Sequence, residues 1–241
     1  MTPKEIRELT ESIPLDLKEI QETAGNTPLT LTTLRDLDAT IDRIFEALSK
    51  LQKPELLDAL CPYFGVIWPS ARALAELVDH SLIAGLQKTL DTKILELGCG
   101  LAMPSLVSAK KGAQAWATDF HPQVERFLVM NREKNQAASL RYVDWDWRSL
   151  PKLPSELRPI WGKADWVIAS DVLYDADLPI PLAKAMAQAA APRGRITITD
   201  PGRPYLQLFC DELTKNQGYR MSTRVVRVKD AQEVFVLDFE R

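Results

Sequence analysis

Two glycines follow a short apolar run in the stretch KILELGCGLAMPSLVSAKKGA, which covers residues 93–113. The chain of 241 residues contains only 10 glycines, yet Gly98 and Gly100 stand where a strand over 94–97 would meet a helix over 103–110. Glycine permits a tight turn and lets a ligand approach the backbone without meeting a Cβ atom. The helix also begins with backbone N–H groups that lack partners. This arrangement is typical of a ligand-binding turn.

An acidic residue stands at the end of the next predicted strand, over 115–118. Asp119 lies 21 residues after Gly98, and a carboxylate at this place can accept hydrogen bonds from both hydroxyls of a ribose. The glycine turn and Asp119 together predict a ligand that contains adenosine. The alternative is that the glycines form only a tight strand-to-helix connection and that Asp119 is a solvated strand end.

Three classes of adenosine ligand compete for this turn. A triphosphate-binding loop requires Gly-Lys-Ser/Thr, which is absent. A dinucleotide site prefers G-x-G-x-x-G, and Met103 stands at the position of the last glycine, where it would hinder a pyrophosphate. S-adenosylmethionine has no phosphate to cradle and tolerates this departure. Glu96 would repel a phosphate but could attract the ammonium group of a methionine moiety, directly or through water.

Strands and helices alternate from residue 93 onward, which predicts a parallel sheet with helices on both faces. The expected fold class is α/β, a Rossmann-like doubly wound sheet of seven strands that ends in an antiparallel hairpin. The expected strands are 94–97, 115–118, 140–143, 166–169, 195–199, 221–228 and 233–239, and the expected helices between them are 103–110, 124–134, 182–190 and 205–214.

The first 60 residues differ from the rest, because they show helical periodicity and no convincing strand. Apolar residues recur at spacings of three and four from Leu34 to Leu48, and Thr33 with Asp36 resembles a capping box at the start of this helix. The expected organisation is an N-terminal helical extension over 1–60 and one domain over 61–241. Within that domain, the aromatic segment over 63–68 is expected to be extended, and Pro69 suits the first turn of a further helix.

The composition excludes several classes of protein. There are 30 basic and 33 acidic residues, a net charge of −3, so there is no basic excess to favour nucleic acid. No apolar run is long enough to predict a membrane span. Cys61, Cys99 and Cys210 stand far apart without a C-x-x-C pair, which predicts no metal site and reduced thiols in the cytoplasm. Neither His80 nor His121 stands near an expected base position.

The segments LELGCG, ATD and ASDVLY together are similar to the class I S-adenosylmethionine-dependent methyltransferases, and more narrowly resemble the seven-β-strand protein-lysine methyltransferases. That family pairs a Trp-Pro segment before the glycine turn with D-x-x-Y after the fourth strand, here Trp68-Pro69 and Asp171–Tyr174. The resemblance covers about residues 60–241. The segment DPGRPYL, at 200–206, is similar to enzymes that methylate lysines of the electron-transfer flavoprotein β subunit. The family usually has a third glycine where this chain has Ala102.

The resemblance implies a cofactor, S-adenosyl-L-methionine, and a role for each matching residue. Gly98, Gly100 and Glu96 would line its methionine end, and Asp119 would bind the ribose. The adenine would lie against VDWDW, where Asp144-Trp145 and Asp146-Trp147 remain alternatives and the second fits slightly better. The full set of residues expected at the cofactor is Trp68, Glu96, Gly98, Gly100, Asp119, Asp146, Trp147, Ala169 and Ser170.

Two residues of the D-x-x-Y motif suit methyl transfer to an amine. A lysine has an ordinary pKa of about 10.4 and must lose a proton before it attacks, so Asp171 could orient the amine and take part in its proton loss. Tyr174 and Trp68 could hold a cation against their ring faces. The alternatives are that Asp171 only caps a helix and that Trp68 only packs in the core.

Three functions remain open from the sequence. The leading hypothesis is a methyltransferase that acts on a lysine of a protein. The second is a small-molecule N-methyltransferase with the N-terminal helices as a lid, and the third is a non-catalytic cofactor-binding scaffold on the same fold. The Asn/Asp-Pro-Pro-Tyr signature of adenine methyltransferases is absent, so with the acidic balance no nucleic-acid partner is expected. The lack of a long apolar run means that no membrane partner is expected either. The sequence does not indicate the oligomeric state.

Overall fold

A seven-stranded sheet forms the centre of the computed structural model, which describes residues 3–84, 89–150, 152–229 and 232–241. The strand order is β5-β4-β3-β6-β7-β9-β8. All neighbours are parallel except β9, which runs antiparallel to both β7 and β8. The strands are β3 (Lys93–Leu97), β4 (Gln114–Asp119), β5 (Arg141–Asp144), β6 (Ala164–Ser170), β7 (Ala190–Asp200), β8 (Arg220–Arg227) and β9 (Glu233–Glu240). The predicted doubly wound fold with its closing hairpin is confirmed.

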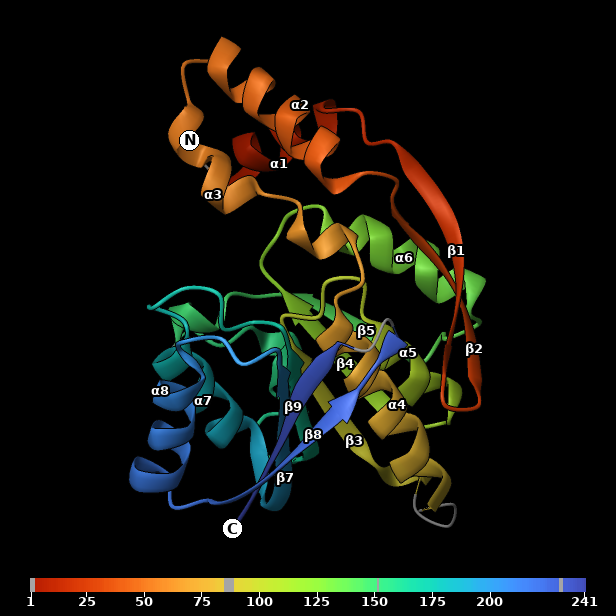
Figure 1. Ribbon diagram of the computed structural model, residues 1–241, viewed down its shortest axis with the longest axis vertical. Coiled ribbons are helices and arrows are strands. Elements are labelled where there is room, and N and C mark those ends of the chain that lie inside the picture. Colours follow the sequence, from red (N-terminus) through yellow and green to blue (C-terminus); the bar gives the residue numbers. More distant parts are fainter. Residues whose placement is uncertain (1–2, 85–88, 151, 230–231) are drawn as a thin grey trace.

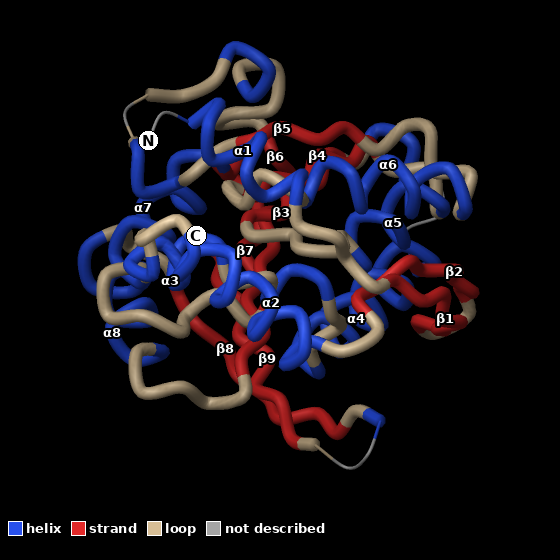
Figure 2. The backbone as a smooth tube through the Cα atoms, turned by 90° about the horizontal axis from the view of Figure 1, so that it is seen from above, coloured by secondary structure: helices blue, strands red, loops and turns tan. Residues whose placement is uncertain are grey.

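Helices cover both faces of this sheet (Figure 2). One face packs against α7 (Pro179–Ala189) and α8 (Leu206–Asp211), and the other packs against α4 (Pro69–Ala84), α5 (Met103–Lys110) and α6 (Val124–Lys134). Alternation along β3 divides the two cores, because Ile94 belongs to one hydrophobic cluster and Leu95 to the other. This is the period of two that a strand buried on both faces requires.

The first 60 residues are not wholly helical, and that part of the prediction is wrong. Residues 17–34 form an antiparallel hairpin of β1 (Leu17–Ala24) and β2 (Thr27–Leu34). The segment TPLTLTTL alternates leucine with β-branched threonine, a pattern that suits a strand, and Leu29 and Leu31 are both buried. Thr33 therefore lies in a strand and forms no capping box, while Asp36 alone caps the next helix by accepting from the Ala39 N–H.

Polar side chains of the domain fasten the hairpin to α6. The Asn131 side-chain oxygen accepts from the Thr32 N–H at 2.7 Å, and its amide donates to the Thr32 carbonyl at 3.4 Å. Asn135 makes the same pair of bonds with Thr30, at 3.0 and 2.7 Å. Each asparagine side chain thus makes the two backbone hydrogen bonds that a neighbouring strand would make with one residue of β2. Leucines of the hairpin also join the core beneath α4 and α5.

The helical part of the extension forms a separate cap. It comprises α1 (Pro3–Ser12), α2 (Leu37–Lys50) and α3 (Leu57–Leu60), and its own small core includes Ile13, Ile44 and Leu48. Figure 1 shows these helices beyond one end of the sheet, while the hairpin runs down beside α4. We call α1, α2 and α3 the helical cap.

Two local predictions also change. Residues 63–65 form a short 3-10 turn where an extended segment over 63–68 was expected. The helix expected over 205–214 is divided into α8 and a π-helical turn, Glu212–Asn216. Such a turn leaves the topology unchanged.

Candidate active site

The glycine turn after β3 requires left-handed backbone at both glycines. Gly98 has φ +68° and Gly100 has φ +51°, values that other residues adopt at a cost. A Cβ atom on Gly98 would lie 2.6 Å from a methyl of Val172 and 3.1 Å from the Trp147 ring. Ala102, where the family usually has glycine, adopts φ +56°. The turn is tight, and its inner side faces a cavity.

Asp119 stands opposite this turn at the end of β4. Its Oδ2 accepts from the Gly100 N–H at 2.9 Å, and its Oδ1 accepts from the His121 N–H at 3.0 Å. Only 7% of the residue is exposed, and burial raises the pKa of its carboxyl above the ordinary value. The two N–H donors fix the direction of the carboxylate, so it is preset to receive hydroxyl donors.

One cavity of about 400 Å³ joins most of the residues predicted from the sequence. Its wall includes Trp68, Gly98, Gly100, Asp119, Trp147, Ser170, Asp171 and Tyr174. Three predicted residues are not part of this wall, namely Glu96, Asp146 and Ala169. The cavity therefore lies beyond the carboxyl ends of β3, β4 and β6, where doubly wound sheets bind their ligands.

Glu96 points beneath α5 instead of into the cavity, contrary to the prediction that it lines the methionine end. It is fully buried, and its Oε2 accepts from both the N–H and the hydroxyl of Ser105 at 3.0 and 2.5 Å. Its Oε1 has no hydrogen-bond partner among the described residues. Burial raises its pKa to about 8. The pleat of β3 directs Glu96 to the face of the sheet that α5 covers.

The segment VDWDW separates into residues with different surroundings. Trp147 lines the cavity and is 2% exposed. Asp146 instead accepts from the Arg148 N–H at 2.9 Å and pairs with its guanidinium, so it caps the short turn that carries Trp147. Trp145 packs edge-on against Trp161 in the core. Of the two candidate pairs, only the second contributes a ring to the cavity.

Asp171 follows β6 with left-handed backbone, φ +61°. It does not cap α7, because Leu178 occupies that position. Its side chain is 5% exposed and forms an ion pair with Arg203, which also lies 3.7 Å from Asp200. Asp200 holds the arginine loop in place by accepting from the N–H groups of Gly202 and Arg203 at 2.7 and 2.6 Å. Arg203 lines the cavity as well.

Three aromatic rings gather at the mouth of the cavity. Tyr63 lies 6.3 Å from Trp68 and 6.4 Å from Tyr174, measured between ring centroids. The Trp68 indole donates to the Tyr63 carbonyl at 2.9 Å, which fixes its orientation. Tyr63 and Tyr174 are 46% and 48% exposed. Partly exposed aromatic rings around a cavity that also contains carboxylates are suited to hold a cation.

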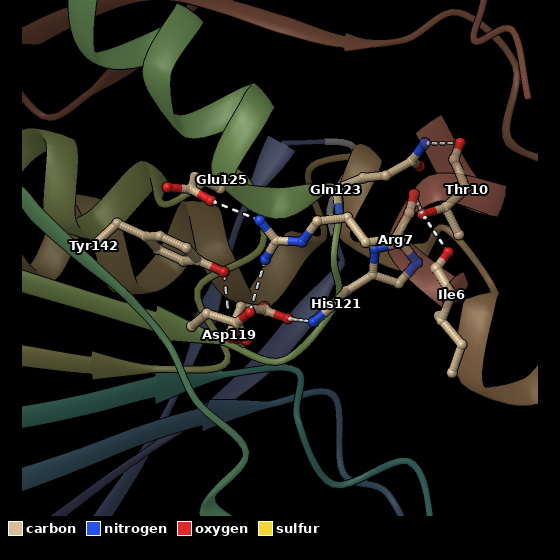
Figure 3. Close-up of polar contacts among 9 residues, drawn as sticks. Ile6, Arg7, Thr10, Asp119, His121, Gln123, Glu125 and Tyr142 are labelled. Carbon is tan, nitrogen blue, oxygen red and sulfur yellow. Dashed lines mark hydrogen bonds and ion pairs between the residues drawn. The ribbon is translucent and has the colours of Figure 1, made fainter. Parts of the chain in front are cut away.

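The loop after β4 connects the cavity to the helical cap. His121 lines the cavity, and its Nε2 lies 3.3 Å from the Leu60 carbonyl while Nδ1 accepts from the Gln123 N–H. Burial lowers the pKa of His121 to about 4, so the ring is neutral at physiological pH. The Gln123 amide donates to the Thr10 carbonyl of α1 at 2.6 Å (Figure 3).

Arg7 of α1 adds ion pairs to this junction. Its guanidinium lies 2.9 Å from Asp144 at the end of β5 and 3.3 Å from Glu125 of α6. Figure 3 shows Arg7 reaching over the loop toward Glu125, with Tyr142 and Asp119 beside it. The Tyr142 hydroxyl donates to the Asp119 carbonyl at 3.2 Å. Asp119 is therefore held directly by the sheet and by its own loop, while Arg7 fastens the cap to the neighbouring Asp144 and Glu125.

Sequence reasoning missed Tyr63, Phe64 and His121 as cavity residues. The run CPYFGVIWP is rich in aromatic residues, which is the signal that could have identified the first two. His121 stands two residues after Asp119, and only the fold brings it to the cavity. Within the part of the chain that the structure describes, no group of three or more His, Cys, Asp or Glu residues could hold a metal ion. No described helix is long and apolar enough to cross a membrane.

Comparisons with known proteins agree with this geometry. The profile of the family described as lysine methyltransferase matches residues 62–207. The electron transfer flavoprotein beta subunit lysine methyltransferase of Xenopus laevis is 26% identical over 191 residues, which are 73% of this chain and 72% of that protein. The histone-arginine methyltransferase METTL23 of Xenopus laevis is 27% identical over 146 residues, 56% of this chain and 58% of that protein.

A solved structure shares the fold. The 16S rRNA N2 G1207 methyltransferase RsmC of T. Thermophilus, in complex with AdoMet and guanosine, superposes with a TM-score of 0.62. The match is 16% identical and covers 95% of this chain and 51% of that one. The family match covers more than half of the residues, and it agrees with a cavity built from a glycine turn and an acidic strand end. The chain belongs to the lysine methyltransferase family and is an S-adenosylmethionine-dependent methyltransferase.

Proposed function

We propose that this enzyme transfers a methyl group to the side-chain amine of a lysine in a protein substrate. The observation that carries the proposal is a single cavity that joins the glycine turn and Asp119 to Asp171 and an exposed aromatic mouth. The family description and the name of the flavoprotein-methylating relative support it. The arginine-methylating relative makes a guanidinium the first alternative acceptor.

The residues present fit S-adenosylmethionine at one end of the cavity. Gly98 lets Val172 and Trp147 pack against the turn where a Cβ atom would collide with them, Asp119 presents an oriented carboxylate for the ribose, and Trp147 offers an apolar ring. Trp68, Gly100 and Ser170 complete the proposed binding set. When bound, the cofactor supplies a methyl group on a positively charged sulfur. The glycine turn accommodates the methionine end, where no phosphate needs to be bound.

The three predicted residues outside the cavity act indirectly in this proposal. Glu96 holds the first turn of α5 through Ser105. Asp146 caps the turn that carries Trp147. Ala169 is fully buried in the sheet, where a larger side chain would displace its neighbours. Each of them shapes the cofactor end without contacting it.

Asp171 and Arg203 prepare the acceptor amine at the other end. A lysine ammonium that enters the cavity meets the Asp171 carboxylate, one oxygen of which already pairs with Arg203. The second cation beside the amine favours its neutral form, and so does removal from water. Asp171 orients the lysine ammonium. The ammonium becomes the nucleophilic amine when it loses a proton to solvent. The catalytic residues of the proposal are Asp171 and Tyr174, with Arg203 as their neighbour.

The aromatic mouth selects a long cationic side chain. Tyr63, Trp68 and Tyr174 present ring faces and edges to the entrance, and each ring contributes ~0.5–2 kcal/mol to holding an ammonium group. Desolvation raises the pKa of Tyr174 to about 12, so this ring stays neutral well above physiological pH. Rings that are nearly half exposed suit a substrate that approaches from outside more than a small molecule enclosed by a lid.

We also propose the partners and the place of action. The acceptor is a protein; a small molecule is the alternative, and neither nucleic acid nor membrane is expected. The enzyme acts in the cytoplasm, where its free thiols Cys61, Cys99 and Cys210 stay reduced. Residues 1–60 form an extension of the methyltransferase domain at 61–241; the start of the family match at residue 62 supports that boundary.

Labelled cofactor tests the proposal directly. Purified enzyme is incubated with S-adenosylmethionine that carries a labelled methyl group, either with a host lysate or with a purified electron transfer flavoprotein β subunit. Label in a discrete protein band, located on lysine by mass spectrometry, is the expected result. Label only in the small-molecule fraction favours the small-molecule acceptor, and label on arginine favours the first alternative.

Two variants separate cofactor binding from turnover. Asp119→Ala should abolish the thermal stabilisation that S-adenosylmethionine gives, because the sugar loses its acceptor. Asp171→Asn should keep that stabilisation and lose the labelled band. Retention of the labelled band in the Asp171→Asn variant would remove Asp171 from the mechanism while leaving the fold and the family untouched.

A further inference from the structure

A second cavity adjoins the active-site cavity and has a volume of about 510 Å³. It lies between the β1–β2 hairpin, the start of α4 and Lys229, which stands two residues after the end of β8. Val66 and Ile67 line both cavities, so one short segment separates them. Figure 1 shows the hairpin running alongside α4. We call this second cavity the hairpin groove.

The charged residues of the hairpin groove are mostly basic. Lys18, Arg35, Arg72 and Lys229 line it, against a single acidic residue, Glu22. The chain as a whole carries a net charge of −3. The excess of cations is therefore a local feature of this groove, because the composition alone favours the opposite sign.

The two arginines hold the groove together. Arg72 binds both carboxylate oxygens of Glu22, at 2.7 and 3.3 Å, and donates to the Ile67 carbonyl at 3.2 Å. Arg35 pairs with Asp16 at 3.1 Å. The Arg72 contacts tie the hairpin to α4 and to the segment shared with the active site, while the Arg35–Asp16 pair joins the two ends of the hairpin. They also neutralise both guanidinium groups.

The two lysines are left without acidic partners. The Lys18 ammonium donates to the Arg35 carbonyl at 3.1 Å and forms no ion pair with a described residue. Lys229 is exposed and has neither a hydrogen bond nor an ion pair with any residue that the structure describes. The lysines come from different elements, so they can contact different points of one bound segment.

The floor between these charges is apolar. Leu34 is buried in the core, and Ile20, Val66 and Ile67 are partly buried against that core. An apolar floor with free ammonium groups at its rim matches a polypeptide that carries both apolar and acidic residues. It does not match a nucleic acid, which would meet Glu22 and would need a longer row of cations along its phosphates.

We propose that the hairpin groove binds an acidic segment of the protein substrate, next in sequence to the lysine that enters the active-site cavity. The proposal rests on the proposed lysine acceptor. It assigns a role to the hairpin: Lys18 of β1 and Lys229 of the segment after β8 recognise the substrate by charge, while Val66 and Ile67 separate the recognised segment from the reacting lysine.

Charge reversal at the two lysines tests the groove. The double variant Lys18→Glu, Lys229→Glu is compared with the control Lys50→Glu, Lys163→Glu, which makes the same change of charge at exposed positions outside the groove. The probes are three labelled peptides of equal length with a central lysine and leucines, flanked by glutamate, by glutamine or by arginine. Fluorescence polarisation gives their affinities, and mass spectrometry follows methylation of the same peptides.

The wild type and the control should bind the glutamate peptide about tenfold more tightly than the glutamine peptide, with the difference shrinking in high salt. The groove variant should lose this preference and favour the arginine peptide, while its thermal stabilisation by S-adenosylmethionine is unchanged. Equal binding of the peptides by the wild type overturns the proposal. So does an oligouridine probe whose binding is lost in the groove variant while peptide binding persists.

Failure of the proposed function gives a different result. In that case the charge preference and its loss in the groove variant are seen in polarisation, but mass spectrometry finds no methyl group on the lysine of any peptide or protein. The hairpin groove would then be a binding site for acidic polypeptide on an enzyme with another acceptor, and its role in lysine recognition would be overturned.

Discussion

Several side chains of the site have surroundings that the sequence could not reveal. The types and spacing of Gly98, Gly100 and Asp119 were enough to predict a ligand that contains adenosine, because backbone freedom and a strand-end carboxylate are local properties. Glu96 was predicted to face the ligand, and its actual direction depends on which face of β3 the helix α5 covers. That choice is made by packing, which a motif does not contain.

Burial of Glu96 predicts an unusual dependence of stability on pH. Its pKa is about 8 in the folded protein and 4.5 ordinarily, so the folded state holds a proton that the unfolded state releases between those values. The free energy of unfolding should therefore fall as pH rises from 4.5 to 8, by at most about 1.4 kcal/mol per pH unit. His121, with its pKa lowered to about 4, gives the opposite slope between 4 and 6.5.

The Glu96→Gln variant isolates this effect above pH 7, where His121 is neutral in both states. Chemical unfolding at pH 7 and pH 8.5 should show a loss of about 1 kcal/mol in the wild type and little change in the variant. An equal loss in both proteins would show that Glu96 is already ionised when folded.

Arg203 allows a second prediction at the scale of one residue. If its guanidinium favours the neutral form of the bound substrate amine, Arg203→Met should move the acid limb of the kcat profile to higher pH, and Arg203→Lys should restore it in part. Stabilisation by S-adenosylmethionine serves as the control and should not change. A variant whose rate falls equally at every pH would mean that Arg203 only positions Asp171.

At the scale of elements, the turn after β3 requires glycine at position 98 for two reasons, its left-handed backbone and the close approach of Val172. Gly98→Ala should cost about 1–2 kcal/mol for the left-handed backbone and more for the contact with Val172. Gly218 offers a matched comparison, because it has φ +73° and a Cβ atom there would meet nothing within 4 Å.

Urea unfolding of the two variants measures the difference. Gly218→Ala should show the backbone cost alone and bind S-adenosylmethionine normally, whereas Gly98→Ala should be less stable and bind it more weakly. If the two variants lose the same stability, the contact with Val172 relaxes freely and contributes nothing.

The elements of the domain were more predictable than those of the extension. The bounds of α5 and α6 agree with the sequence prediction, because one proline stands in the first turn of α5 and another just before the start of α6, Gly112 follows α5 and Asn135 follows α6. The hairpin over 17–34 was missed because its leucines also fit a helical spacing that continues into α2. Threonine content was the signal against a helix, and the partners Asn131 and Asn135 lie a hundred residues away in the chain.

On the scale of the whole molecule, hairpin and sheet should unfold together. Asn131→Ala removes both bonds to Thr32 and leaves buried backbone groups without partners, at about 1–3 kcal/mol for each group. Calorimetry should show one transition at a lower temperature, since leucines of β2 share the core beneath α4. Asn216→Ala, at an exposed position bonded to Glu212, is the control. A separate early transition would mean that the hairpin folds independently.

The loop from Asp119 to Gln123 joins the sugar-binding carboxylate to α1 and α3 through His121 and the Thr10 carbonyl. We expect these contacts to couple binding at the nucleoside end of the cavity to docking of the helical cap. Such a coupling is thermodynamically reciprocal, because each event changes the free energy of the other by the same amount. Substitutions in α1 or α3 that weaken these contacts should therefore change cofactor affinity, even though no residue of the helical cap belongs to the glycine turn.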